Sequence, residues 1–444
     1  MRKRLISLFA AAALLGSVSI ASAGTVTTSS DTNITLGGFV NEYFIWGNNQ
    51  ATNEDPSSLY PFQTNANAPT FTEGSGFKKP PAAQTNFNST AMWTRLNFAF
   101  DNKSEGVSGL VDGDFLKGGG FAGSPALFRL RDAYFKKTFD VSTTFQPYVL
   151  IGQTWALDTY NEYSLNNVSG TAGAVGGFDD PRVPQVTFGA NMDFGSVKIN
   201  PQFGFEDLIF GVQESANDGY EVSAQGGYKI LNGITVRSQM PGIGLNVPIT
   251  FNTGFGSPAT FYVNAEMQPV KVTSSNANIN SESKTSWRVG TGFELPIYAL
   301  SLLGNVSYSR GFALYNSFVV GNNPIPASYW VDKNGSLQTT NATQWDIEAK
   351  LDFNKLAQLP FAIAGGYSQQ IFSNYNNVTG YDTTNNTYYA TSNKASTIFA
   401  NVTYNMTKSI MLGLEYDRNK TYYANDPNTA YNANVVYLMG QYSF

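Results

Sequence analysis

The sequence of 444 residues contains no cysteine and no histidine. Without cysteine no disulfide framework can form, and without either residue type no Cys/His zinc site can form. The lack of histidine also excludes a Ser-His-Asp triad and an imidazole general base, so we predict that the protein is not an enzyme. Charged residues make up 13% of the chain, about half of their usual share in a soluble domain. No nucleotide-binding motif is present, so no cofactor is expected.

The abundant residues are those of strands and loops. The chain holds 42 Gly, 25 Tyr and 32 Phe, and it is rich in Asn, Thr and Ser. These residues favour β-strands and the turns between them over helices. Beyond the N-terminal segment, no stretch is apolar over the ~18 residues that a transmembrane helix needs.

Residues 1–23 have the three parts of a secretory signal peptide. A basic start, Met1–Arg4, precedes an apolar stretch that ends near Ile20, and the small residues Ala21-Ser22-Ala23 follow. We expect cleavage before Gly24, which leaves residues 24–444 as a single domain. Cleavage removes three cations and takes the formal net charge from −5 to −8. The mature chain is therefore expected to be exported and acidic, without the basic surface of a nucleic-acid-binding protein.

Many segments alternate apolar and polar residues with a period of two. In the clearest one, Gln344–Phe353, the apolar residues Trp345, Ile347 and Ala349 alternate with Asp346 and others. Because neighbouring side chains of a strand point to opposite faces, such a segment suits a sheet between lipid and water. Strands of about 10 residues match a tilted bilayer crossing. The same alternation recurs in Arg95–Asp101, Val197–Glu206, Phe261–Gln268 and Ser286–Leu295.

Short and long polar connections alternate along the chain, which is typical of a barrel with tight periplasmic turns and long extracellular loops. The sequence predicts an all-β fold, a transmembrane antiparallel β-barrel of 16 strands in the bacterial outer membrane. A weak pair of segments, Gly233–Arg237 and Asn246–Phe251, would raise the number to 18. The aromatic terminus Phe444 is expected to be recognised by the barrel-assembly machinery, and the lipid bilayer is the expected surrounding partner.

A barrel of this size is too wide for its own wall residues to fill, so an aqueous channel is expected. The polar face of the alternation supplies charges that could line it and create a transverse field. Each of them could equally be a solvated wall residue. The basic candidates are Arg95, Arg129, Arg131, Lys198, Arg288 and Lys350, and the acidic ones are Glu206, Glu266, Asp346, Glu348 and Asp352.

Arg129 and Arg131 share one face of their predicted strand, which places Asp132 on the opposite face, toward lipid. A lipid-facing aspartate is unfavourable. Either a bulge turns Asp132 inward, or the strands over residues 127–155 face a neighbouring subunit. The second alternative predicts oligomerisation.

The stretch Ala156–Pro184 follows the fifth predicted strand and is the third outer loop. We interpret it as a loop that folds inward and narrows the pore, with Asp179 and Asp180 as constriction candidates. A plain exposed loop is the alternative.

Four segments in order carry a resemblance to a known family: Thr94–Phe98, Phe128–Phe135, Leu150–Trp155 and Arg182–Val186. Together they resemble the DcaP-like trimeric outer-membrane porins, a family implicated in uptake of dicarboxylic and other anionic solutes. The resemblance covers about a quarter of the chain. It implies a 16-stranded protomer, a homotrimer and pore arginines, which are here Arg95, Arg129, Arg131 and Arg182.

The function predicted from the sequence is that of a porin, a passive diffusion channel for small hydrophilic solutes. The resemblance extends these to anionic and dicarboxylic solutes. The alternative is a structural or adhesive outer-membrane barrel with a blocked lumen and functional surface loops.

Overall fold

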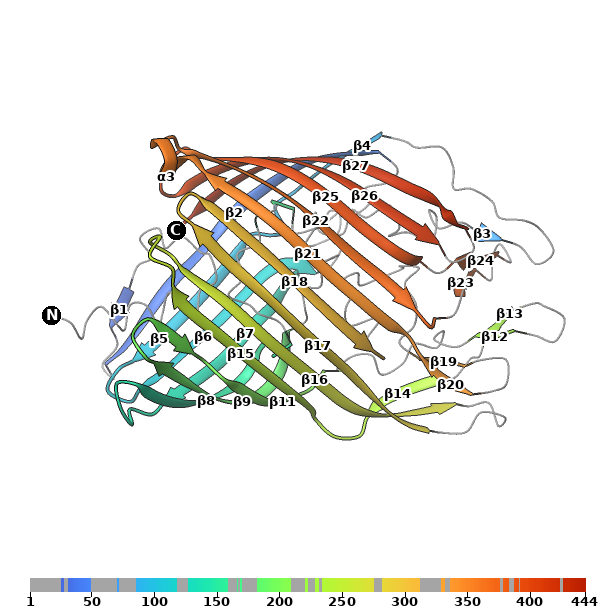
Figure 1. The fold of residues 1–444 in the computed structure, drawn as a ribbon, viewed down its shortest axis with the longest axis horizontal. Helices are drawn as coiled ribbons and strands as arrows, with labels where there is room; N and C mark the ends of the chain where they lie inside the picture. The colour runs from blue at the N-terminus through green and yellow to red at the C-terminus, as the bar shows by residue number, and fades with distance from the viewer. Residues whose placement is uncertain are drawn as a thin grey trace.

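Backbone pairing closes the chain into an antiparallel β-barrel (Figure 1). The barrel closes where β2 (Thr32–Asn48) pairs with β27 (Asp426–Ser443), in a register that runs from Phe39 opposite Ser443 to Gly47 opposite Val435. The computed structural model describes residues 25–27, 31–48, 70–71, 85–117, 127–158, 166, 168–169, 182–208, 220–222, 228–230, 234–274, 282–311, 329–331, 336–375, 378–382, 387–390, 392–423 and 426–444.

The wall has 16 strands, as predicted. The main sheet contains 20 strand segments, but three pairs of segments lie end to end beside a common neighbour, and the short β1 (Thr25–Thr27) pairs only with the start of β2. Each end-to-end pair forms one strand of the wall. These pairs are β4 (Thr85–Thr90) with β5 (Arg95–Asn102), β10 (Val197–Ile199) with β11 (Gln202–Glu206), and β14 (Ile234–Ser238) with β15 (Gly242–Asn252).

The remaining strands of the wall are continuous and follow in chain order. They are β6 (Val107–Lys117), β7 (Leu127–Thr138), β8 (Phe145–Trp155), β9 (Arg182–Asp193), β16 (Pro258–Ser274), β17 (Glu282–Ile297), β18 (Leu300–Arg310), β21 (Asn341–Asp352), β22 (Phe361–Ser373), β25 (Ser392–Asn405) and β26 (Ile410–Tyr423).

The 18-strand alternative is wrong because its two weak segments belong to a single strand. Both β14 and β15 pair with β16, with Ile234 opposite Ser274 and Asn252 opposite Pro258. Pro241 stands between the two segments, and a proline has no N–H to donate to the backbone hydrogen bonds between strands. Because of this interruption, the sequence pattern suggests two strands where there is one. It also does not indicate the short turn at 253–257 that follows β15.

The two ends of the barrel differ in their connections. At one end, which we call the short-turn end, the links are short, as at 298–299 and at 353–360, where the helix α3 (Phe353–Ala357) lies. The short strand β1 and the C-terminus lie at this end (Figure 1). The opposite end, which we call the long-loop end, carries the long connections. Small hairpins lie in these connections: β12 (Tyr220–Val222) with β13 (Tyr228–Ile230), β19 (Tyr329–Val331) with β20 (Leu337–Thr339), and β3 (Thr70–Phe71) with β23 (Val378–Asp382) and β24 (Thr387–Ala390).

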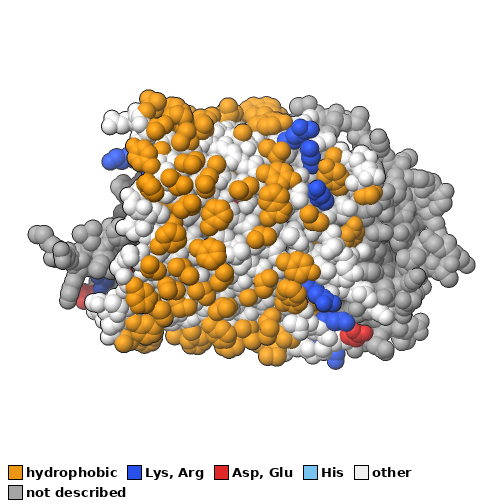
Figure 2. All heavy atoms as spheres, in the orientation of Figure 1, with side chains coloured by type: hydrophobic (Ala, Val, Ile, Leu, Met, Phe, Trp, Pro, Cys, Tyr) orange, Lys and Arg blue, Asp and Glu red, His pale blue; other side chains and the backbone are white. Residues whose placement is uncertain are grey.

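Apolar side chains lie outside and charged side chains lie inside, which is the reverse of their distribution in a soluble protein. On β21, Ile347 is 53% exposed, whereas its neighbours Asp346 and Glu348 are 2% and 1% exposed. Apolar side chains cover the outside of the wall in a broad band (Figure 2). Because successive strand residues alternate between faces, the charged neighbours of these exposed apolar residues, such as Asp346 and Glu348, point into the barrel. Among the described residues, no helix is long and apolar enough to cross a membrane.

Candidate functional site: the barrel interior

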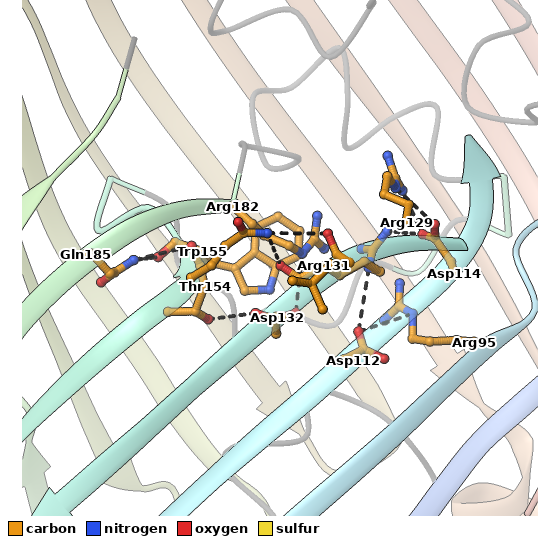
Figure 3. A network of polar contacts seen from close by, with 12 residues as sticks. Arg95, Asp112, Asp114, Arg129, Arg131, Asp132, Thr154, Trp155, Arg182 and Gln185 are labelled. Atoms are coloured by element: carbon orange, nitrogen blue, oxygen red, sulfur yellow. Dashed lines mark hydrogen bonds and ion pairs between the residues drawn. The ribbon is translucent and has the colours of Figure 1, made fainter. Parts of the chain in front are cut away.

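Four arginines and three aspartates form a ladder on the inner wall, which we call the arginine–aspartate ladder (Figure 3). Its tightest part joins β6 and β7. Arg129 donates two parallel hydrogen bonds to the carboxylate of Asp114, from Nε to Oδ1 at 2.9 Å and from Nη2 to Oδ2 at 2.7 Å. Arg131 donates to the same carboxylate at 2.6 Å. Such charge-assisted pairs fix the guanidinium groups in place.

The ladder extends from this pair in both directions around the wall. On β6, Asp112 lies between Arg95 and Arg131, with nitrogen–oxygen distances of 3.7 and 3.6 Å. Farther on, Arg182 lies 3.4 Å from Asp132 and stacks on the ring of Trp155, with 3.5 Å from its guanidinium carbon to the ring centroid. The ladder therefore runs over the five neighbouring strands from β5 to β9.

A β-bulge settles the orientation of Asp132. The β6–β7 register shifts between Asp112, opposite Asp132, and Gly113, opposite Leu130, so Arg131 is the extra residue. Arg131 and Asp132 consequently both point inward, 8% and 5% exposed. Asp132 accepts a hydrogen bond from the hydroxyl of Thr154 at 2.7 Å. The first of the two sequence alternatives is thus correct, and Asp132 supplies no argument for a subunit interface.

The ladder carries one more positive than negative group. Its arginines differ in accessibility: the side chains of Arg95 and Arg129 are 23% and 28% exposed, against 9% for Arg131 and 7% for Arg182. A passing anion would therefore meet Arg95 and Arg129 first. All four arginines implied by the resemblance lie in this ladder. Asp112 and Asp114 lie on the inward face of β6, two residues apart. The sequence pattern alone does not show that they pair with these arginines.

The stretch after β8 enters the barrel and is bound to the wall formed by β11, β16 and β17. Asp158 forms an ion pair with Arg288 at 2.8 Å. Its carbonyl oxygen accepts from Asn264 at 2.6 Å, and the backbone N–H of Leu157 donates to Glu206 at 2.9 Å. Arg288, which was predicted to line the pore, is only 2% exposed. It is buried in its ion pair with Asp158 instead.

Asn166, Val168 and Ser169 of the same connection contact the far side of the interior, on β21 and β26. Glu348 accepts from the backbone N–H of Asn166 at 2.7 Å. Glu415 accepts from the N–H groups of Val168 and Ser169, the latter at 2.7 Å. Asp417 accepts from the hydroxyl of Ser169 at 3.0 Å. The described parts of this third connection therefore lie inside the barrel, against two separate parts of the wall.

An apolar patch on the inner wall packs against Val168. The patch consists of buried residues on β2 and β27, with Val168 packed against it, and the hydroxyl of Tyr43 donates to the carbonyl oxygen of Val168 at 3.1 Å. Gly413 lies beneath: a Cβ there would come within 3.1 Å of the Val168 side chain. The patch residues are Tyr43, Ile45, Val435, Tyr437 and Met439.

The other predicted candidates do not join the ladder. Lys198 is 57% exposed near the short-turn end and pairs with Asp193 at 3.2 Å. Lys350 is half-buried near the same end, and the carboxylate of Asp352 accepts from the N–H of Asn354 and caps α3. Asp346 accepts from the hydroxyl of Ser368 at 2.7 Å. Asp179 and Asp180 lie outside the described residues.

The ladder and the two carboxylates Asp346 and Glu348 on β21 occupy opposite sides of the barrel. Counted around the wall from β2, β7 is the fourth strand and β21 the twelfth of the 16, so half of the circumference separates them. Arg129 and Arg131 on β7 therefore face the side that carries Asp346 and Glu348. Opposed charged groups of this kind are the arrangement that a transverse field would require.

No protein-family model matches the sequence, and no curated protein does. Among solved structures, the outer membrane channel DcaP of Acinetobacter baumannii superposes with a TM-score of 0.64 at 20% identity, covering 95% of this chain and 100% of that chain. The chain has the fold of that channel. OprB of Pseudomonas putida (TM-score 0.49, 11% identity, 92% and 94% covered) and OmpT of Vibrio cholerae (0.47, 10%, 95% and 100%) resemble it less. The DcaP fold named by the sequence resemblance is confirmed, and the likeness extends over nearly the whole chain.

Proposed function

We propose that the protein is an outer-membrane porin, a passive diffusion channel for small hydrophilic solutes with a preference for anionic and dicarboxylic ones. The arginine–aspartate ladder is the observation that carries the proposal. It places positively charged forks, which match carboxylates in geometry, on the inner wall of a barrel whose outside is apolar. The transverse field across the interior would orient solutes that carry charge.

Uptake into liposomes tests this proposal. Liposomes that contain the purified protein are expected to swell faster in a small dicarboxylate than in a neutral sugar of similar size, because the ladder attracts carboxylates. Protein-free liposomes are the control for leakage. Equal rates for the two solutes would contradict the anionic preference and leave a general porin, and no swelling in either would contradict the channel.

One observation favours a second candidate, a structural or adhesive barrel with a blocked lumen. Carboxylates on the inner wall are almost fully covered where Asn166, Val168 and Ser169 contact them. Glu348 and Glu415 are each 1% exposed and Asp417 is 0% exposed. A loop held this firmly could close the pore. Absence of swelling in every solute, with the barrel folded, would favour this candidate over a porin.

Export and assembly complete the proposal. Residues 1–23 would act as the signal peptide, and Phe444 would be recognised by the barrel-assembly machinery. Phe444 follows the closing strand directly, and its N–H donates to the carbonyl oxygen of Gly38 at 3.1 Å.

We also propose that the porin is a homotrimer in which the outer face of β2 contacts a neighbouring subunit. Glu42 supports this. It is half-buried and lies on the outer face, since it alternates along β2 with the exposed side chains of Val40 and Phe44, two residues before and after it. A carboxylate at this level is unfavourable against hydrocarbon and is better placed against another subunit.

Cysteine labelling tests the trimer face, because the chain contains no cysteine of its own. In one protomer Val40 and Ile347 are almost equally exposed, 50% and 53%. In liposomes, a lipid-soluble maleimide is expected to label Ile347→Cys on β21 readily and Val40→Cys poorly. Equal labelling would contradict an interface at β2.

A further inference from the structure

Six basic side chains lie on the outer surface of the barrel toward the long-loop end. Each shares the outer face of its strand with exposed apolar residues: on β26, for example, Arg418 follows Leu414 and Tyr416, which are 48% and 44% exposed. We call these six residues the outer basic girdle. They are Arg237 on β14, Lys271 on β16, Arg310 on β18, Lys394 on β25, and Arg418 and Lys420 on β26.

The girdle lies where the apolar band ends. The β26–β27 register pairs Tyr416 with Val436 and then Arg418 with Asn434, so both strands change from apolar to polar at the same level. Figure 2 shows Lys and Arg side chains in two groups along the long-loop border of the band. Tyr422 lies among them, 5.3 Å from the Lys394 ammonium to its ring centroid. Basic and aromatic residues at this level are typical of a membrane–water interface.

One pair of girdle residues is arranged unfavourably without a counterion. Arg237 on β14 lies directly opposite Lys271 on β16, and like charges in this position destabilise a sheet. Within the part of the chain that the structure describes, no carboxylate forms an ion pair with any of the six residues, and the nearby Glu282 is paired with Lys284 at 2.8 Å. An anion between Arg237 and Lys271 would remove the repulsion.

We infer that the outer basic girdle binds the phosphate groups of anionic lipid in the outer leaflet. Lipid is the occupant that fits, because the cations stand directly beside the apolar band, where headgroups meet water, and because all six carry the same charge. Each Lys or Arg near an anionic membrane surface contributes about 1 kcal/mol, or about a 5-fold gain in affinity. This inference rests on the outer-membrane location in the proposed function.

Lipid binding to the purified protein in neutral detergent tests the inference. Native mass spectrometry is expected to show bisphosphorylated lipid A bound to the wild-type barrel and fully dephosphorylated lipid A bound far more weakly. The variant Lys394→Gln/Arg418→Gln/Lys420→Gln should lose affinity on the order of 100-fold at this group. The matched control Lys103→Gln/Lys355→Gln/Lys408→Gln removes three exposed cations at the short-turn end and should bind as wild type does.

Three results would overturn the inference: equal wild-type affinity for the two lipids, an equal loss in both triple variants, or complete competition by inorganic phosphate at matched concentration. The comparison of the two lipids on the wild-type protein tests the inference even if a variant fails to fold. A failure here leaves liposome swelling untouched, whereas loss of the porin function would appear as absent swelling with lipid still bound.

Discussion

Asparagine in place of Asp112 is expected to raise the preference of the channel for anions, and glutamine in place of Arg129 to lower it. The ladder has one surplus positive charge, so Asp112→Asn doubles the surplus and Arg129→Gln removes it. Asp112 suits the test because its ion-pair distances are long, 3.7 and 3.6 Å, and an amide of the same shape can replace it. Between the two variants, the anion-to-cation permeability ratio should change on the order of 10-fold. Reversal potentials in a salt gradient measure it.

The control for this pair is Lys198→Gln. Lys198 is also a cation on the inner face, but it is 57% exposed near the short-turn end, where solvent and salt screen its charge. Its removal should leave selectivity nearly unchanged. A shift of Asp112→Asn and Arg129→Gln in the same direction, or of neither, would show that the ladder does not set selectivity.

Alanine in place of both Glu348 and Glu415 is expected to give a larger or noisier conductance. These two carboxylates accept the N–H groups of Asn166, Val168 and Ser169. Hydrogen bonds to charged groups contribute about 1.5–3 kcal/mol each, and the double variant removes the three that these carboxylates accept from these N–H groups. The bonds of Ser169 to Asp417 and of Val168 to Tyr43 remain. The backbone pairing of β21 and β26 with their neighbours does not depend on these side chains, so the barrel itself is expected to stay intact. Single-channel recording measures the outcome.

Asp101→Ala is the matched control for the loop attachment. Asp101 is a half-buried carboxylate of β5 near the short-turn end, opposite Ser108, far along the barrel from the attachment sites. It should conduct as wild type does. If the Glu348→Ala/Glu415→Ala variant also conducts as wild type does, Asn166, Val168 and Ser169 do not define the narrowest part of the pore.

The wall of the barrel was predictable from the sequence because lipid imposes a strict rule on it. Every spanning strand must pair on both edges and face lipid on one side, so the alternation around Ile347 fixes both the strand and its orientation. Where a local feature broke the alternation, the prediction failed. Pro241 made one strand look like two, and the bulge at Arg131 left the direction of Asp132 undecided.

The interior was less predictable because its contacts join residues far apart in the chain. Glu415 lies 246 residues from Ser169, to which it is bonded, and no local pattern distinguishes it from a solvated wall residue. Glu348 and Arg288 were assigned as pore-lining residues for the same reason. Three arginines of the ladder, Arg95, Arg129 and Arg131, follow from the alternation, and the family resemblance added Arg182. Their pairing with aspartates required the strand register.

A planar-bilayer recording of the purified wild-type protein tests the central claim most directly. We propose a wall that is apolar outside and charged inside, around a water path that residues 156–158, 166, 168 and 169 narrow without sealing. We expect discrete, stable current steps from pure protein. A folded, correctly inserted barrel that carries no current under any voltage would contradict it.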